Sequence, residues 1–169
     1  MVSHTLHVKW CIRLGVLEKV CREVNIIIDR KCGKHDVGRR EGLVYIDAGG
    51  IKIPVIGRGR RYAGMKIGGL SIRKTYLDAE ELAECLRKFY GEPIPDCVLK
   101  SAFLHHFLDE IKDIIKTGVI EAGEAEKIVS EVASRLEGFK NLKASIFEEV
   151  YRFLQKHARE VIDDVLKEV

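Results

Sequence analysis

Side-chain amides and prolines are scarce in this chain of 169 residues. It contains one glutamine, Gln155, two asparagines, Asn25 and Asn141, and three prolines, against 29 lysines plus arginines and 26 aspartates plus glutamates. Hyperthermophile proteins show the same trend toward few heat-labile amides and abundant charge. The composition therefore predicts a thermophilic source.

Long apolar runs are also absent. No run approaches the ~18 residues that a membrane span requires, and the first residues lack the basic start and apolar stretch of a signal peptide. Apolar residues nevertheless make up 46% of the chain and charged residues 33%, a globular composition rather than a disordered one. The sequence predicts a cytoplasmic protein that makes no contact with a membrane.

The cysteines form no Cys-x-x-Cys pair, and their number is odd: Cys11, Cys21, Cys32, Cys85 and Cys97. Zinc ribbons and thioredoxin-like redox sites depend on such a pair, so neither is supported. Free cysteine is among the most buried residue types. We therefore expect buried thiols, with one disulfide as the alternative that hyperthermophile proteins allow.

The first segment has a period of two. Its apolar residues alternate with polar residues, which favours a half-buried strand over Leu6, Val8, Trp10, Ile12 and Leu14. A helix is the alternative, and it would place His4, His7 and Cys11 on one face. Helical spacing then predicts a short helix from Val16 to Val24, and residues 25–29 are expected to form a buried strand.

Glycine-rich turns in the next segment predict two hairpins. The first pairs Leu43–Asp47 with Ile51–Ile56 through a turn at Gly49 and Gly50. The second joins residues 65–67 to residues 70–74. Pro54 cannot donate a hydrogen bond to a neighbouring strand, which predicts an edge strand or a bulge there.

The remainder of the chain has helical spacing. Capping residues and glycines predict helices over 78–91, 96–117, 121–137 and from 143 to the end. We therefore expect an α+β fold, with a small antiparallel, hairpin-rich sheet in the N-terminal half followed by three or four packed helices. Residues 1–75 would form a basic, glycine-rich β segment with one short helix, and residues 76–169 an acidic helical bundle, with the option that both pack as a single domain.

Charge divides along the same line. Residues 30–74 contain twelve basic and three acidic residues, whereas residues 75–169 contain 13 basic and 20 acidic residues. Guanidinium groups bind phosphates and tyrosines stack on bases. The segment therefore predicts binding of RNA, single-stranded DNA or another polyanion through Arg39, Arg40, Arg58, Arg60, Arg61, Tyr62, Lys66 and Arg73.

The basic segment has a second interpretation. It can pair with the acidic helices, either within the chain or across a homo-oligomer, because net charge governs association rather than a specific site. In that case the chain is a self-assembling interaction protein without catalysis. A homo-oligomer is expected in either case.

One short motif resembles a known family. His35-Asp36-Val-Gly-Arg39 is similar to the core of the HD phosphohydrolases, in which a His-Asp pair binds a divalent metal. The resemblance implies a metal-dependent phosphohydrolase using His35 and Asp36, with His4 as an upstream ligand and the His105-His106 pair with Asp109 supplying later ligands. Such a metal lowers the pKa of a bound water.

A cysteine–histidine zinc site is a further alternative, which would combine Cys32, His35 and Asp36 with His7 and Cys11. Apart from such a divalent metal, no cofactor is expected. No motif in the sequence names a reaction.

Overall fold

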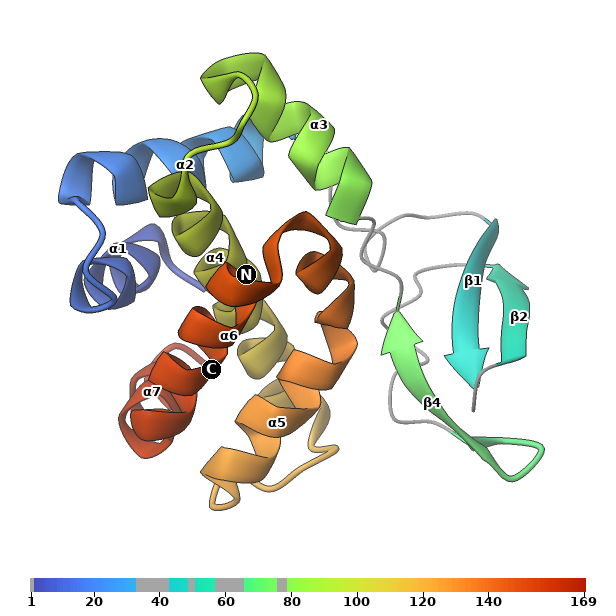
Figure 1. Ribbon diagram of the computed structural model, residues 1–169. Helices are drawn as coiled ribbons and strands as arrows, with labels where there is room; N and C mark the ends of the chain where they lie inside the picture. Colours follow the sequence, from blue (N-terminus) through green and yellow to red (C-terminus); the bar gives the residue numbers. More distant parts are fainter. Residues whose placement is uncertain (1, 33–42, 49–50, 57–65, 76–78) are drawn as a thin grey trace.

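The computed structural model describes residues 2–32, 43–48, 51–56, 66–75 and 79–169 (Figure 1). In chain order the elements are α1 (His4–Arg13), α2 (Glu18–Lys31), β1 (Leu43–Ala48), β2 (Ile51–Ile56), β3 (Lys66–Ile67), β4 (Leu70–Thr75), α3 (Ala79–Tyr90), α4 (Asp96–Thr117), α5 (Ala125–Arg135), the 3-10 turn η3 (Glu137–Phe139), α6 (Lys140–Lys156) and α7 (Ala158–Leu166). Among these described elements, no helix is both long enough and apolar enough to cross a membrane.

The first segment is a helix, so the strand predicted over residues 6–14 is wrong. The Ser3 side chain caps α1 by accepting a hydrogen bond from the Leu6 amide. The buried residues are Leu6, His7, Val8, Trp10 and Cys11, whereas Ile12 is 44% exposed. The alternating pattern misleads because it counts His7 and Cys11 as solvent-facing, although both are needed to complete the buried helical face.

The second predicted strand, residues 25–29, is also wrong, because α2 continues through it. Its run of isoleucines suits a strand by propensity, but tertiary packing overrides local propensity. Val24, Ile27 and Ile28 are buried, and Asn25 is buried beside them. Asn25 and Asp29 are one turn apart and therefore lie on the same side of α2.

Helix α4 is the centre of the molecule. It contacts α1, α2, α5, α6 and α7, and Figure 1 shows it surrounded by these helices. Phe103 is fully buried and stacks on Phe139 at 4.8 Å between ring centroids. Gly118 ends the helix in the left-handed conformation, with φ 65°, as the sequence predicts. A helix covered on every side has no solvent face, so its polar residues must find partners inside the protein.

The last predicted helix is divided. Helix α6 contains a non-helical residue, Lys143, with φ −163° and ψ 102°, and the chain bends again at His157 before α7. Helix α7 returns to α1, where Asp164 accepts hydrogen bonds from Lys9 and from the Trp10 indole at 2.5 and 3.2 Å. The C-terminal end is thereby bound to the first helix.

The strands lie to one side of the helices, next to α5 (Figure 1). Their order is β2-β1-β4-β3, and all paired strands are antiparallel. The two predicted hairpins correspond to β1–β2 and β3–β4. Pro54 lies in β2, at an edge of this arrangement.

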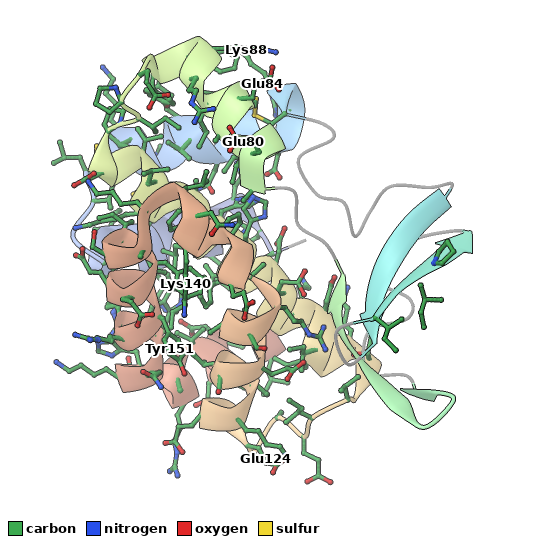
Figure 2. The ribbon with its side chains drawn as sticks, turned by 45° about the vertical axis from the view of Figure 1, so that its right-hand side comes forward. Glu80, Glu84, Lys88, Glu124, Lys140 and Tyr151 are labelled. Carbon is green, nitrogen blue, oxygen red and sulfur yellow. A yellow bond between two sulfur atoms is a disulfide. The ribbon has the colours of Figure 1, made fainter. Side chains whose placement is uncertain are left out.

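The predicted fold class is nevertheless wrong. Among the residues whose side-chain burial the structure describes, the hydrophobic core comes from residues 2–32 and 82–165, that is, from helices and their connections. The body of the protein is therefore all-α, and two of its helices come from the N-terminal segment that was expected to be mainly sheet. Charged side chains such as Glu84 and Lys88 cover the outer face of α3 (Figure 2).

Two disulfides replace the free thiols that we expected. Cys11–Cys21 joins α1 to α2, and Cys32–Cys85 joins the end of α2 to α3. Cys97 is the free cysteine of the described residues, and it is exposed rather than buried. Sequence spacing cannot show these pairs, because the partners are brought together by the packing of the helices.

Candidate metal centre

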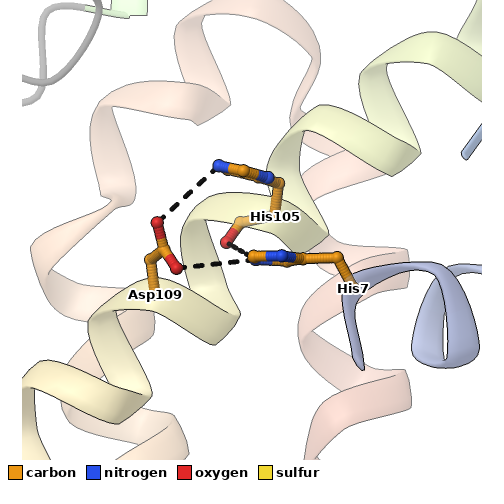
Figure 3. A group of neighbouring side chains, drawn as sticks. All are labelled: His7, His105 and Asp109. Atoms are coloured by element: carbon orange, nitrogen blue, oxygen red, sulfur yellow. Dashed lines mark hydrogen bonds and ion pairs between the residues drawn. The ribbon is translucent and has the colours of Figure 1, made fainter. Parts of the chain in front are cut away.

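Three buried side chains from α1 and α4 meet inside the helical body. They are His7, His105 and Asp109 (Figure 3), and one potential ligand atom of each lies within 4.8 Å of those of the other two. His7 Nε2 is 3.5 Å from Asp109 Oδ1, and His105 Nε2 is 3.7 Å from Asp109 Oδ2. Their side chains are only 1–3% exposed. We refer to these three residues as the metal cluster.

The two helices place the cluster through their periodicity. His105 and Asp109 are one turn apart on α4 and so lie on the same face. His7 is buried on α1 opposite that face, where its ring stacks on the His105 ring with 4.2 Å between centroids and 12° between planes. The stacking fixes the two imidazoles side by side, with Asp109 at their edge.

Asn25 determines which nitrogen of His105 carries hydrogen. His105 Nδ1 lies 2.8 Å from Asn25 Oδ1. A carbonyl oxygen only accepts hydrogen bonds, so Nδ1 is the donor. In the neutral ring the lone pair is then on Nε2, the atom that faces Asp109. A metal-binding histidine is typically held in this way, by a hydrogen bond from its other nitrogen.

A second carboxylate, Asp29 of α2, lies on the other side of His105. Its Oδ1 is 3.5 Å from His105 Nε2, and its Oδ2 accepts a hydrogen bond from His4 Nε2 at 2.7 Å. The Asp29 side chain is 7% exposed, whereas that of His4 is 43% exposed. His4 therefore connects the buried carboxylate to the protein surface.

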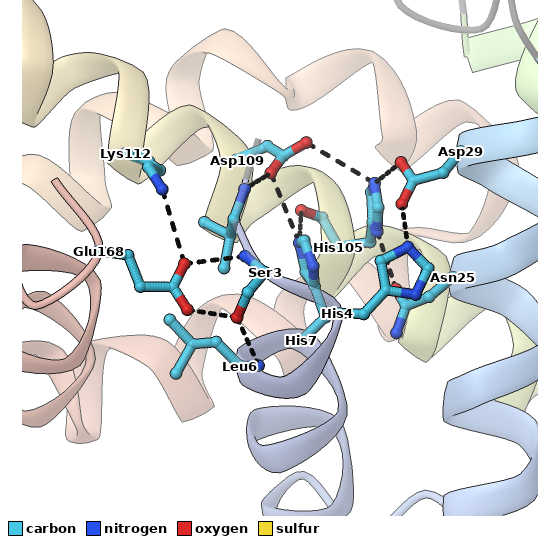
Figure 4. A network of polar contacts seen from close by, with 11 residues as sticks. Ser3, His4, Leu6, His7, Asn25, Asp29, His105, Asp109, Lys112 and Glu168 are labelled. Atoms are coloured by element: carbon cyan, nitrogen blue, oxygen red, sulfur yellow. Dashed lines mark hydrogen bonds and ion pairs between the residues drawn. The ribbon is translucent and has the colours of Figure 1, made fainter.

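Asp109 is held by the start of the chain. The Val2 amide donates to Asp109 Oδ1 at 2.6 Å. The next residue, Ser3, donates to Glu168 through its amide at 2.8 Å and through its hydroxyl, and Lys112 lies 3.6 Å from the same carboxylate. Figure 4 shows this network running from Asp29 through the metal cluster to Glu168.

Electrostatics favour a neutral imidazole at His7. Burial lowers the pKa of His7, and the negative charges of Asp109 and Asp29 offset only part of that effect. At neutral pH the ring is therefore uncharged, and a neutral imidazole is the form that binds metal ions. Nε2 of His7 lies 3.3 Å from the His105 carbonyl oxygen, which only accepts, so in the neutral ring without metal Nε2 carries the hydrogen. Nδ1 is buried and makes no hydrogen bond within the described part of the chain, and a metal ion bound at Nε2 would move the hydrogen to Nδ1.

Two other buried polar residues of α4, His106 and Glu110, have partners outside the metal cluster, although the His106 ring also meets the His105 ring edge-on, with 5.2 Å between centroids. His106 packs its ring against Phe139 at 5.4 Å, and Glu110 lies 3.7 Å from the Arg135 guanidinium of α5. The rings of His105 and His106 therefore have different main partners, as expected for adjacent residues that point about 100° apart on a helix.

The structure agrees in part with one of the two metal sites predicted from the sequence and contradicts the other. Of the ligands implied by the resemblance to HD phosphohydrolases, His105 and Asp109 belong to the metal cluster and His4 reaches it only through Asp29. His106 packs against Phe139 instead, and His35 and Asp36 are outside the described residues. The zinc site with Cys11 and Cys32 is wrong, because both sulfurs are in disulfides and no thiolate remains to bind metal.

The predicted nucleic-acid site cannot be placed in the same way. Lys66 is in β3 and Arg73 is in β4. The rest of the site lies outside the described residues, namely Arg39, Arg40, Arg58, Arg60, Arg61 and Tyr62. Binding of a polyanion by this segment stays a prediction.

Sequence reasoning missed three participants. The sequence predicts a strand over residues 25–29, which include Asn25 and Asp29, and it predicts a role for His7 only in the cysteine–histidine zinc site. The sequence does contain one indication of the site: the helical alternative for the first segment puts His4 and His7 on one face. Their partners come from α2 and α4, with His7 and His105 98 residues apart in the sequence.

Comparison with known proteins adds no likeness to this site. The chain matches no protein-family model, no curated protein and no solved structure.

Proposed function

We propose that the protein is a metal-binding protein that holds one divalent transition-metal ion at His7, His105 and Asp109. The observation that carries the proposal is the convergence of three ligand atoms within 4.8 Å of one another at a buried position. Two imidazole nitrogens and one carboxylate oxygen form a donor set that proteins use for zinc and for iron(II).

The chemistry of the donors narrows the choice of ion. Calcium and magnesium prefer sites made of oxygen atoms, whereas imidazole suits zinc, iron, copper and nickel. Burial of the Asp109 carboxylate is costly unless its charge is compensated. A divalent cation between Asp109 and two neutral imidazoles would add to the partners that Asp109 already has, such as the Val2 amide.

A metal-free arrangement is the competing explanation. There His105 would be protonated and would act as an imidazolium paired with the buried carboxylates. Hydrogen bonds between such charged groups are usually about 2.7–2.9 Å long, whereas His105 Nε2 lies 3.5 Å from Asp29 and 3.7 Å from Asp109. The longer separations support a shared cation over a shared proton.

The experiment is metal analysis followed by titration. Protein purified without chelator is analysed for bound metals, then stripped and titrated with Zn²⁺ while the melting temperature is followed. We expect about one ion per chain. Because the ion binds the folded state, a free concentration of 100 times Kd stabilises the protein by about 2.7 kcal/mol.

Matched variants locate the site. Asp109→Asn and His7→Gln should each abolish most of the stabilisation by Zn²⁺. The controls are Asp163→Asn, on the exposed face of α7, and His157→Gln, between α6 and α7, and both should respond as the wild type does. Wild-type protein that carries well below one ion per chain and gains no stability from Zn²⁺, Fe²⁺ or Co²⁺ would falsify the proposal.

A further inference from the structure

Asp29 lies beside the metal cluster, and one of its carboxylate oxygens accepts no hydrogen bond from a described residue. Its Oδ1 is buried, accepts no hydrogen bond from any described residue, and lies 3.5 Å from His105 Nε2. The other oxygen is held by His4. Leaving a buried carboxylate oxygen without a hydrogen bond is costly, so the position of Oδ1 requires an explanation.

His105 supplies the reason to look for a cation there. Its Nδ1 donates to Asn25, and its Nε2 faces Asp29 Oδ1 on one side and Asp109 Oδ2 on the other. In the neutral ring these three atoms are all acceptors and repel one another. In a tetrahedral zinc site with bonds of about 2.0–2.1 Å, neighbouring ligand atoms are roughly 3.4 Å apart. The separations of 3.5 and 3.7 Å are close to that value.

Building on the proposed function, we propose that Asp29 is the fourth ligand of the metal ion. The complete site then consists of two histidines and two aspartates, and the two carboxylates balance the charge of a divalent ion. Four protein ligands without a place for water are typical of structural rather than catalytic zinc sites. The ligand class is a divalent ion that accepts four-coordinate geometry, with zinc as the best match.

Asp29 is not one of the three residues whose ligand atoms lie within 4.8 Å of one another. Binding therefore draws its carboxylate inward, and with it the last turn of α2. His4 is a positioning residue: it holds Oδ2 of Asp29 and leaves Oδ1 facing the ion. With Asp29 included, the metal ties together three helices, α1, α2 and α4.

The test uses Co²⁺, whose visible absorption is strong in four-coordinate sites and weak in six-coordinate ones. Wild-type protein should show the strong, four-coordinate spectrum. Asp29→Asn keeps the size of the side chain and should bind Co²⁺ at least about tenfold more weakly, with a weaker spectrum because water replaces the carboxylate. His4→Gln should weaken binding less and keep the four-coordinate spectrum. Asp163→Asn is the control and should match the wild type in both readouts.

Other results of these experiments would overturn either the role of Asp29 or the proposed function as a whole. If Asp29→Asn keeps wild-type affinity and spectrum while Asp109→Asn loses both, Asp29 is not a ligand and the three-residue site stands. If wild-type protein binds neither Co²⁺ nor Zn²⁺, the proposed function fails and this inference fails with it. If Asp29→Asn does not fold, hydrogen exchange of the wild type decides: Zn²⁺ should slow exchange at the last turn of α2, and unchanged exchange there overturns the inference.

Discussion

The Oδ1 atom of Asn25 accepts a hydrogen bond from Nδ1 of His105 at 2.8 Å, and the two residues are 80 positions apart in the sequence. Both side chains are 1% exposed. Together with stacking on the His7 ring, this contact orients the His105 ring, which faces two carboxylates. Losing it should therefore affect both the stability of the core and the binding of metal.

Asn25→Ala should therefore damage both properties. It leaves the Nδ1 donor of His105 buried without a partner, which should lower the free energy of unfolding by about 1–3 kcal/mol. It should also weaken metal binding by about 10–100-fold, the usual effect of removing a residue that orients a ligand. Urea denaturation and Zn²⁺ titration measure the two effects.

Asn141→Ala is the matched control, because Asn141 is the other asparagine of the chain and is exposed near the start of α6. Its stability and metal affinity should equal those of the wild type. An Asn25→Ala protein with unchanged Zn²⁺ affinity would show that the orientation of His105 does not matter for binding.

The disulfides should contribute differently to stability. In the chain-entropy description a cross-link stabilises more when it closes a longer loop. Cys32 and Cys85 are 53 residues apart and Cys11 and Cys21 are 10 apart, which corresponds to about 4 and about 3 kcal/mol. Double serine variants of each pair, compared by urea denaturation, should reproduce this order.

Cys97→Ser is the control for the disulfide series and should leave stability unchanged, because Cys97 is exposed and unpaired. Thiol counting supplies the independent check. We expect one reactive thiol in the native protein and five after reduction and unfolding. Three or more reactive thiols in native protein prepared without reductant would contradict the pairing.

Glu168 should make the stability depend on pH. Burial alone raises the pKa of its carboxyl, but hydrogen bonds from Ser3 and the charge of Lys112 outweigh burial and lower the pKa below its usual value. A carboxyl with a lowered pKa stabilises the folded state above the unfolded pKa, about 4.3, and this contribution is lost as pH falls through the folded pKa.

Glu168→Gln should consequently be less stable than the wild type at pH 7, and the difference should shrink as the pH is lowered below about 4. Urea denaturation across this range measures it. Glu84→Gln, on the exposed face of α3 (Figure 2), is the comparison and should follow the wild type throughout. A difference that grows at low pH would contradict the assignment.

The basic segment yields a prediction about salt. If Arg58, Arg60 and Arg61 contact phosphates, each contact releases counterions, and log affinity for single strands falls with log salt by about 0.7 per contact. Changing all three to alanine should flatten that slope by roughly two units, whereas Tyr62→Ala should cost about 1–3 kcal/mol with little change in slope. Fluorescence anisotropy with a labelled RNA measures both.

The charge-pairing alternative gives opposite results. The wild type would then bind no RNA even at low salt, and the triple variant would lose thermal stability or change its oligomeric state. Size-exclusion chromatography and melting curves of the same two proteins distinguish the alternatives.

Local signals in the sequence predict the central helix well. The glycine at 118 ends α4 where the sequence predicts, because a left-handed residue there depends only on the local sequence. At the other end the helix begins at Asp96 as expected, but Pro95 is the N-cap residue and no side chain of the described residues caps the helix, so Asp96 is not the N-cap that the sequence predicts. The first helix was missed because two of its buried residues, His7 and Cys11, are not apolar in the usual sense. His7 is buried with polar partners and Cys11 is buried in a disulfide, and a pattern of apolar residues detects neither kind of burial.

The site was predictable only in part. Resemblance to HD phosphohydrolases suggests His4, the His105-His106 pair and Asp109 as ligands, and of these only His105 and Asp109 lie in the metal cluster. His4 contacts Asp29 beside it. Asp29 and Asn25 could not be found in this way, because their role depends on α2 lying against α4. Such contacts between distant segments follow from packing and leave no periodic trace in the sequence.

The bond between Cys32 and Cys85 has a consequence for proteolysis. The four strands of the described residues and the whole arginine-rich stretch from Arg39 to Arg73 lie between these two residues. A protease that cuts anywhere within this interval opens the backbone but leaves both pieces attached through sulfur. The nicked protein therefore migrates as a single species until a reductant is added, and only then separates into its N-terminal and C-terminal fragments.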